Sequence, residues 1–252
     1  MASGVPSKLP KITTAFWVMK IAATTLGETA GDLLSMTLNV GYAASSLILL
    51  SGFVLSLVAQ LVSKRYRPAL YWTVILSTST AGTTMSDYMD RTLGLGYAKG
   101  AALLVTILLC LFVAWRWTTG TLSVESVRTR KAELCYWIAI LFSNTLGTAL
   151  GDFLADSSGL GFLGGGLLIG GLLALVLLLN FHARLSRVLL FWIAFVLTRP
   201  FGATVGDLLT KSKDRGGLNF GTVGSSAILA GILVVFVVWA MFKERRPVLA
   251  SP

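Results

Sequence analysis

The chain is poor in charged residues, which make up 13% of its 252 positions. That is about half the share found in an ordinary soluble domain. Hydrophobic residues make up 55%, and the mean hydropathy is +0.78. So few charges could not cover the surface of a soluble protein of this size. The composition therefore argues against a soluble domain.

Cysteine and histidine are also scarce. The two cysteines, Cys110 and Cys135, lie in or beside apolar segments without a CxxC pair, so we interpret them as small apolar residues. The single histidine, His182, cannot build a zinc or copper site alone. No HExxH motif, P-loop or nucleophile–His–acid set is present. We therefore expect no enzyme activity and no catalytic residue.

Long segments without any charge are abundant. They include Ala43–Val62 with 20 residues, Leu163–Phe181 with 19 and Thr222–Phe242 with 21. About 20 apolar residues are enough for a helix to cross a bilayer. The sequence therefore predicts an all-α integral membrane protein, with eight transmembrane helices and both termini in the cytoplasm.

The net charge of +10 reflects how the basic residues are distributed along the chain. Fifteen of the 21 fall on one alternate set of segments, which places those segments and both termini in the cytoplasm by the positive-inside rule. They are Lys8, Lys11, Lys20, Lys64, Arg65, Arg67, Arg116, Arg128, Arg130, Lys131, Arg184, Arg187, Lys243, Arg245 and Arg246. The opposite set holds Arg91, Lys99, Lys211, Lys213 and Arg215. We expect membrane lipid and a small cation as partners, and no nucleic acid. The sequence leaves a homo-oligomer open.

One pattern recurs four times without gaps. A tryptophan is followed after ten residues by glycine, after fourteen by a small residue and after fifteen by aspartate. The copies are Trp17, Gly27, Gly31 and Asp32; Trp72, Gly82, Ser86 and Asp87; Trp137, Gly147, Gly151 and Asp152; and Trp192, Gly202, Gly206 and Asp207. Such internal similarity predicts a repeat architecture.

A glycine–aromatic pair follows the aspartate in three copies, as Gly41-Tyr42, Gly96-Tyr97 and Gly161-Phe162, and opens the second helix. The fourth copy departs from this with a short insertion around 216–220. We predict four units, at 1–68, 69–131, 132–187 and 188–252, within one membrane domain. A longer polar linker, about 118–131, is expected to join two four-helix halves.

Each unit holds two spans, so the four repeats are parallel. They permit either a pseudo-four-fold ring or a pseudo-two-fold pair of halves.

The segments TLGETAGD, TAGTTMSD, TLGTALGD and RPFGATVGD resemble a bacterial inner-membrane family built of four copies of a two-helix repeat of unknown function. The resemblance covers nearly the whole chain and implies the repeat architecture and an inner-membrane location.

The small residues four apart form a face that lets helices pack closely in lipid. The aspartate adjoins this face, about 22 Å beyond the tryptophan, which we expect at the cytoplasmic interface. Charged residues inside a membrane are costly and must face protein, water or a cation. Asp32, Asp87, Asp152 and Asp207, with Glu28 one turn before Asp32, are therefore the expected ion or substrate site, and the four aspartates the candidate metal ligands. The alternative is that they cap helix ends.

Hydroxyl and amide side chains continue the aspartate face, at Thr25, Thr80, Thr83, Asn144, Thr145 and Thr148. Oxygen ligands suit hard cations such as Mg²⁺, Ca²⁺ or Mn²⁺, and clustered carboxylates can also share protons. We predict this stripe to be a polar path, and a bound divalent cation to be the sole candidate cofactor.

The fourth copy carries Arg199 and Pro200 inside its first helix. The proline favours a kink, and the arginine needs a carboxylate such as Asp207 or Glu28. Arg199 is either a tethered countercharge that exchanges with a transported ion or one half of a fixed salt bridge.

These features favour a transporter or exporter of a cation, either a hard divalent metal or a proton-coupled ion. The alternatives are a cation channel with an aspartate ring and a membrane scaffold or sensor that transports nothing.

Overall fold

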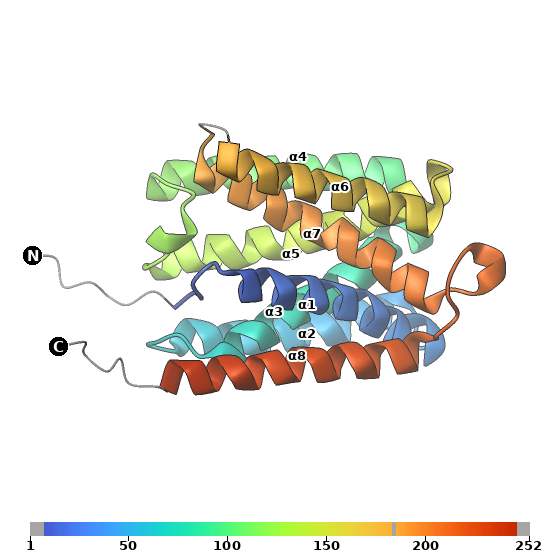
Figure 1. Cartoon of the computed structure of the whole chain (residues 1–252), viewed down its shortest axis with the longest axis horizontal. Coiled ribbons are helices and arrows are strands. Elements are labelled where there is room, and N and C mark those ends of the chain that lie inside the picture. Colours follow the sequence, from blue (N-terminus) through green and yellow to red (C-terminus); the bar gives the residue numbers. More distant parts are fainter. Residues whose placement is uncertain (1–7, 183–184, 246–252) are drawn as a thin grey trace, which may run out of the picture.

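A computed structural model describes residues 8–182 and 185–245, so Arg184 and Arg246 lie outside the described residues. Within these residues the chain forms eight α-helices (Figure 1). The first helices of the four repeats are α1 (Thr14–Asp32), α3 (Pro68–Asp87), α5 (Arg130–Asp152) and α7 (Arg187–Thr210). The second helices are α2 (Tyr42–Val62), α4 (Tyr97–Thr119), α6 (Gly161–His182) and α8 (Thr222–Arg245).

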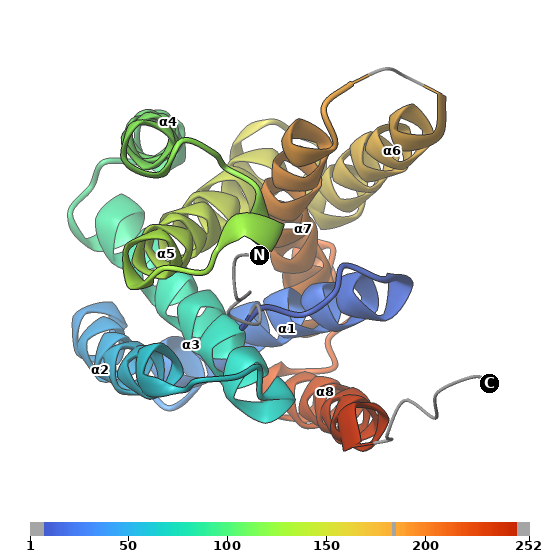
Figure 2. The same cartoon turned by 90° about the vertical axis from the view of Figure 1, so that its left-hand side faces the viewer.

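The first helices form a closed inner ring, because α1 packs on α3, α3 on α5, α5 on α7 and α7 on α1. Each outer helix packs on the inner helix of the following repeat, and α8 closes the circle on α1 (Figure 2). The ring decides between the two symmetries that the sequence permits, in favour of the pseudo-four-fold arrangement. We call its ends the tryptophan end, where the inner helices begin, and the aspartate end.

Six of the described helices, α2 and α4 to α8, are long and apolar enough to cross a membrane. Helix α1 is less apolar because it carries Lys20, Glu28 and Asp32, and α3 because it is rich in serine and threonine. Both helices are largely buried within the ring, so most of their polar residues face protein. Large apolar residues such as Leu55, Leu167 and Val235 are exposed on the outer helices. Polar groups inside and apolar groups outside are what a membrane environment requires.

Aromatic contacts between successive repeats close the ring at the tryptophan end. The residue before each tryptophan packs on the tryptophan of the next repeat. Ring centroids are 5.7 Å apart for Phe16–Trp72, 5.4 Å for Tyr71–Trp137, 6.1 Å for Tyr136–Trp192 and 5.8 Å for Phe191–Trp17. Trp72, Trp137 and Trp192 are buried. These three tryptophans therefore pack on neighbouring helices inside the bundle. Their expected position at the cytoplasmic interface stays a prediction.

Close contacts of the repeat glycines hold the inner helices together. Each glycine ten residues after a tryptophan faces the residue that lies seven positions after the tryptophan of the next repeat. Gly27 packs on Ser79, Gly82 on Asn144, Gly147 on Arg199 and Gly202 on Thr24. A Cβ atom at any of these glycines would clash with its neighbour. The small residue is thus required by the approach of the backbones, as the small-residue pattern predicts.

The turn between the two helices of each repeat is built on paired left-handed residues. In the fourth copy these are Asn219 and Gly221, with φ of 61° and 73°, and α8 begins at the next residue. The equivalent pairs are Asn39 and Gly41, Gly94 and Gly96, and Gly159 and Gly161. The helix-opening glycine of the fourth copy is therefore Gly221, so the aromatic residue, Phe220, precedes the glycine instead of following it.

The segments after the aspartates differ between copies. In the first three, the inner helix continues as a five-residue π-helix, Leu33–Thr37, Tyr88–Thr92 or Phe153–Ser157. In the fourth, α7 ends at Thr210, and an insertion with a short 3₁₀ turn, Lys213–Arg215, leads to α8. The spacing from aspartate to helix-opening glycine is nine residues in the first three copies and fourteen in the fourth.

The central linker packs across the tryptophan end. Trp192 Nε1 donates to the carbonyl of Leu122 over 2.9 Å, and Val124 and Val127 are buried. The ring is continuous across the linker, so the expected division into two four-helix halves is wrong. The four unit boundaries stay a prediction.

Gly82 offers a direct test of the ring contacts. A Cβ there would lie 2.9 Å from backbone atoms of both Asn144 and Thr145, which cannot move aside as a flexible side chain can. We expect Gly82→Ala to lower the free energy of unfolding by about 1–3 kcal/mol. Gly52→Ala on α2 is the matched control, because a Cβ there meets no atom within 4 Å. Thermal unfolding in detergent measures both, and equal midpoints for the two variants would contradict close helix approach at Gly82.

Candidate functional site

Asp32, Asp87 and Asp152 are the last residues of α1, α3 and α5, and Asp207 lies near the end of α7. All four aspartates are at most 3% exposed. Two basic residues pair them. Arg91 Nε lies 2.8 Å from Asp87 Oδ1, and its Nη2 lies 3.1 Å from Asp152 Oδ2. Lys211 Nζ lies 2.6 Å from Asp32 Oδ2 and 3.0 Å from Asp207 Oδ1. Each cation thus bridges the aspartates of two successive repeats.

Both cations occupy the position four residues after their own aspartate. The same position holds Met36 in the first repeat and Asp156 in the third. The charges therefore reduce the four-fold backbone to a pseudo-two-fold arrangement, with one bridged pair between repeats 2 and 3 and another between repeats 4 and 1.

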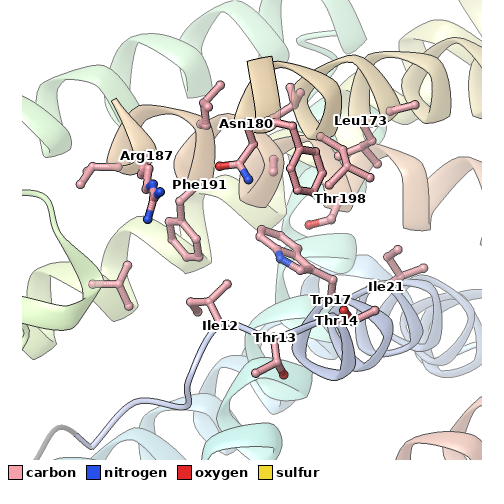
Figure 3. A pocket seen from close by; sticks show the side chains of 18 of the residues that line it. Ile12, Thr13, Thr14, Trp17, Ile21, Leu173, Asn180, Arg187, Phe191 and Thr198 are labelled. Carbon is pink, nitrogen blue, oxygen red and sulfur yellow. The ribbon is translucent and has the colours of Figure 1, made fainter. Parts of the chain in front are cut away.

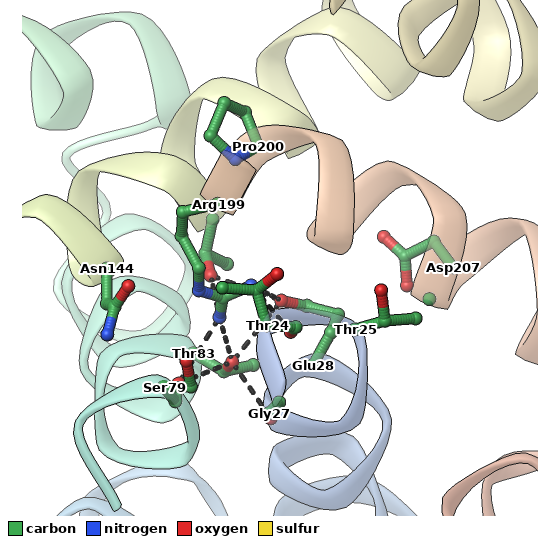
Figure 4. Close-up of polar contacts among 12 residues, drawn as sticks. Thr24, Thr25, Gly27, Glu28, Ser79, Thr83, Asn144, Arg199, Pro200 and Asp207 are labelled. Atoms are coloured by element: carbon green, nitrogen blue, oxygen red, sulfur yellow. Dashed lines mark hydrogen bonds and ion pairs between the residues drawn. The ribbon is translucent and has the colours of Figure 1, made fainter. Parts of the chain in front are cut away.

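A second polar layer lies on the ring axis, one turn before the aspartates (Figure 4). Arg199, fully buried, donates from Nη1 to Glu28 Oε2 over 3.0 Å. Its Nη2 donates to the hydroxyls of Thr83 and Thr148, the latter over 2.8 Å, and to the carbonyl of Ser79 over 3.3 Å. The partner of Arg199 is thus Glu28 and not Asp207.

The hydroxyls of Thr83 and Thr148 also lie 3.2 Å from Glu28 Oε2. These three residues occupy equivalent positions in repeats 1, 2 and 3, where Ala203 completes the layer in repeat 4. Arg199 therefore has acceptors on α1, α3 and α5, which makes it a fixed link across the ring.

Three carboxylates come together among the described residues. Glu28, Asp32 and Asp207 can each place one oxygen within 4.8 Å of the others, and all three are buried. We call them the acidic cluster. Gly206 brings α7 against Glu28, since a Cβ there would lie 2.9 Å from Glu28 Cβ. The candidate ligand set thus includes Glu28, whereas Asp87 and Asp152 lie outside this group of three.

The predicted polar path divides in two. Thr83, Thr148 and Asn144 face neighbouring helices, and Asn144 donates to Thr78 over 2.9 Å. The other members, Thr25, Thr80 and Thr145, each donate to a backbone carbonyl of their own helix. The hydroxyls of that second group therefore bond within their own helices. Helix α7 runs through Pro200, whose ring points away from the polar contacts (Figure 4).

Three basic residues of this region count toward the predicted topology but are not part of the site predicted from the sequence. Lys20 is fully buried, with its Nζ 3.5 Å from Asn144 Oδ1 and 4.0 Å from the centre of the Phe195 ring. Arg91 and Lys211 are apparent from sequence only when the repeat alignment extends four residues beyond the aspartates. Their pairing across repeats requires the ring.

A groove of about 1050 Å³ opens near the tryptophan end, between α1, α6, α7 and the central linker (Figure 3). Trp17, Phe191 and Leu173 are among its mostly apolar lining residues, and it reaches Thr198, next to Arg199. The acidic cluster and the other two aspartates are not among the residues that line it. The groove is therefore separate from the carboxylates.

A family model, Repeat of Unknown Function (DUF347), matches the chain four times, at residues 15–66, 70–121, 135–186 and 190–246. The chain therefore belongs to this family, and its internal repeat is confirmed. Neither a curated protein nor a solved structure matches the chain.

The contact between Arg199 and Glu28 allows a double-mutant test. Removing one member of a buried ion pair leaves an uncompensated charge, which costs about 3–5 kcal/mol. We expect Arg199→Met and Glu28→Gln each to lower the thermal unfolding midpoint strongly. The double variant should be more stable than the sum of the two losses predicts. Additive losses would show that the two side chains are not coupled.

Proposed function

We propose that this chain crosses a bacterial inner membrane eight times, with both termini in the cytoplasm, and transports a cation through the acidic cluster. The apolar outer helices and the polar interior support the membrane part of this proposal. The family has no assigned function, so the proposal rests on the site itself.

The orientation rests on the distribution of basic residues over the two ends of the ring. Described segments at the tryptophan end carry Lys64, Arg65, Arg67, Arg128 and Arg187, among others. At the aspartate end, Arg91 and Lys211 are held by aspartates, which leaves Lys99, Lys213 and Arg215. An excess of basic residues marks the cytoplasmic side, so the tryptophan end is the proposed cytoplasmic end.

One observation carries the cation proposal: buried carboxylates outnumber the cations that pair with them. Glu28 and the four aspartates supply five negative charges, whereas Arg91, Arg199 and Lys211 supply three positive charges. The difference of two charges is costly in a buried site. A divalent cation or two protons would balance it. Carboxylate and hydroxyl oxygens favour a hard cation such as Mn²⁺ or Mg²⁺.

The closed axis favours a carrier over an open channel. The aromatic ring fills the tryptophan end, Arg199 spans the middle, and the aspartates are at most 3% exposed. A carrier must alternate access to such an enclosed site, whereas a channel needs a continuous path. The fixed contacts of Arg199 support its role as a structural countercharge.

The proposed orientation can be tested by cysteine labelling. In a background lacking Cys110 and Cys135, we expect Asp214→Cys to react with a membrane-impermeant maleimide in intact spheroplasts. Lys64→Cys should react only after the membrane is permeabilised, because it lies at the opposite end. Both positions are exposed, so the protein itself shields neither cysteine from the maleimide. The reverse labelling pattern would contradict the proposed topology.

Transport can be tested with Mn²⁺ and Mg²⁺ uptake into proteoliposomes. We expect Asp32→Asn to reduce the flux about tenfold or more, because it removes a ligand of the acidic cluster. Asp156→Asn is the control, since Asp156 is exposed and lies outside the cluster.

Equal flux for wild type and Asp32→Asn would exclude the acidic cluster as the transport site. Voltage-driven flux that needs no coupling ion would indicate the channel alternative. Absent flux, with one partner co-purifying, would indicate a scaffold or sensor.

A further inference from the structure

The acidic cluster already holds a cation that belongs to the protein. Lys211 Nζ contacts Asp32 Oδ2 and Asp207 Oδ1, which are two of the three cluster carboxylates. A metal ion bound by the cluster would take oxygens of the same carboxylates at about 2.0–2.6 Å. The ammonium group and an incoming cation therefore compete for one place.

The other aspartate pair differs in its surroundings. Arg91 bridges Asp87 and Asp152, and the side chain one turn before Asp152 is the neutral Thr148. At the Lys211 pair, the equivalent position holds Glu28, which supplies a third carboxylate. Among the described residues, the two aspartates that Lys211 bridges thus belong to a three-carboxylate group that could hold a metal ion, and the two that Arg91 bridges do not.

The two basic side chains also differ chemically. The guanidinium of Arg91 is planar and contacts its two aspartates through different nitrogens, Nε and Nη2. The Lys211 side chain is 15% exposed and that of Arg91 30%, so exposure does not favour the release of Lys211. The ammonium of Lys211 is, however, a compact charge on a flexible stem, and it needs no planar alignment with its carboxylates. Lysine is therefore the cation that can leave its carboxylates for water at the lower cost.

The backbone around Lys211 is distinct as well. Arg91 lies within the continuous π-helical turn after α3, whereas Lys211 directly follows the end of α7 and precedes the insertion found in the fourth repeat alone. The insertion folds back on this position, because Asn219 N–H donates to the Lys211 carbonyl over 2.9 Å and Gly217 packs on the same carbonyl. The position of Lys211 is thus tied to an exposed loop at the aspartate end.

We propose that Lys211 is a tethered competitor, which occupies the acidic cluster when it is empty and leaves when a cation binds. Arg91 stays in place and holds the second pair together. This inference deepens the proposed function and rests on it. It transfers the exchanging role from Arg199, which has acceptors on three helices, to Lys211.

Binding of Mn²⁺ to the purified full chain, measured by calorimetry in detergent, tests the proposal. We use Lys211→Met, since methionine is the residue at the equivalent position of the first repeat, and Arg91→Met as the matched control. If Lys211 leaves the cluster free about one-tenth of the time, its removal should strengthen the apparent affinity about tenfold. Arg91→Met removes a positive charge of the same buried site but no contact with the cluster, so it should strengthen the affinity clearly less than Lys211→Met does.

A third variant, Lys211→Arg, keeps the charge and protects the test against misfolding of Lys211→Met. Its guanidinium is a stronger competitor for carboxylates, so we expect weaker Mn²⁺ binding than in wild type. Unchanged affinity in Lys211→Met or in Lys211→Arg, or equal gains in Lys211→Met and Arg91→Met, would overturn the inference.

The failure of the inference can be separated from that of the proposed function. If wild type binds Mn²⁺ and Asp32→Asn does not, while Lys211→Met leaves the affinity unchanged, the cluster is a cation site and only the competitor role fails. If neither wild type nor Lys211→Met binds Mn²⁺ and wild type carries no flux, the inference and the proposed function fail together.

Discussion

The close approach of one inner helix to the next is the constraint on which the rest of the structure depends. Gly27, Gly82, Gly147 and Gly202 let each inner helix lie against its successor in the same register. Four equivalent contacts of this kind, each made head to tail, close a ring. Because every helix is shifted in the same way, equivalent residues meet as layers around one axis, and the aromatic contacts at the tryptophan end follow the same rule.

The layers explain why so many polar groups can be buried in this bundle. The outer helices cover the ring with apolar side chains, so a charge on an inner helix must be met inside the ring or at its ends. Arg199 meets Glu28 on the axis, and Arg91 and Lys211 each meet two aspartates. The backbone repeats four times, but these cations break the repeat, and the breaks place three carboxylates together between repeats 4 and 1.

Differences between the copies therefore carry the functional interpretation. A ring with four equal aspartates would offer four equal sites. Instead, Glu28 adds a carboxylate at one interface, and Lys211, four residues after Asp207, contacts two of the three cluster carboxylates. The buried carboxylates outnumber the cations that pair with them, and this excess supports the proposed cation site. The groove at the tryptophan end is separate from this site.

By itself the sequence determined the features that depend on local pattern. The spacing of tryptophan, glycine and aspartate showed the four repeats and the buried acidic positions, and the apolar runs indicated membrane helices, because helical periodicity and length are local properties. Only the tertiary structure decided four other features. These are the choice between a ring and two halves, the partner of Arg199, the burial of the tryptophans, and the pairing of Arg91 and Lys211 across repeats. Each depends on which helix lies beside which, and such contacts join residues 51 to 179 positions apart.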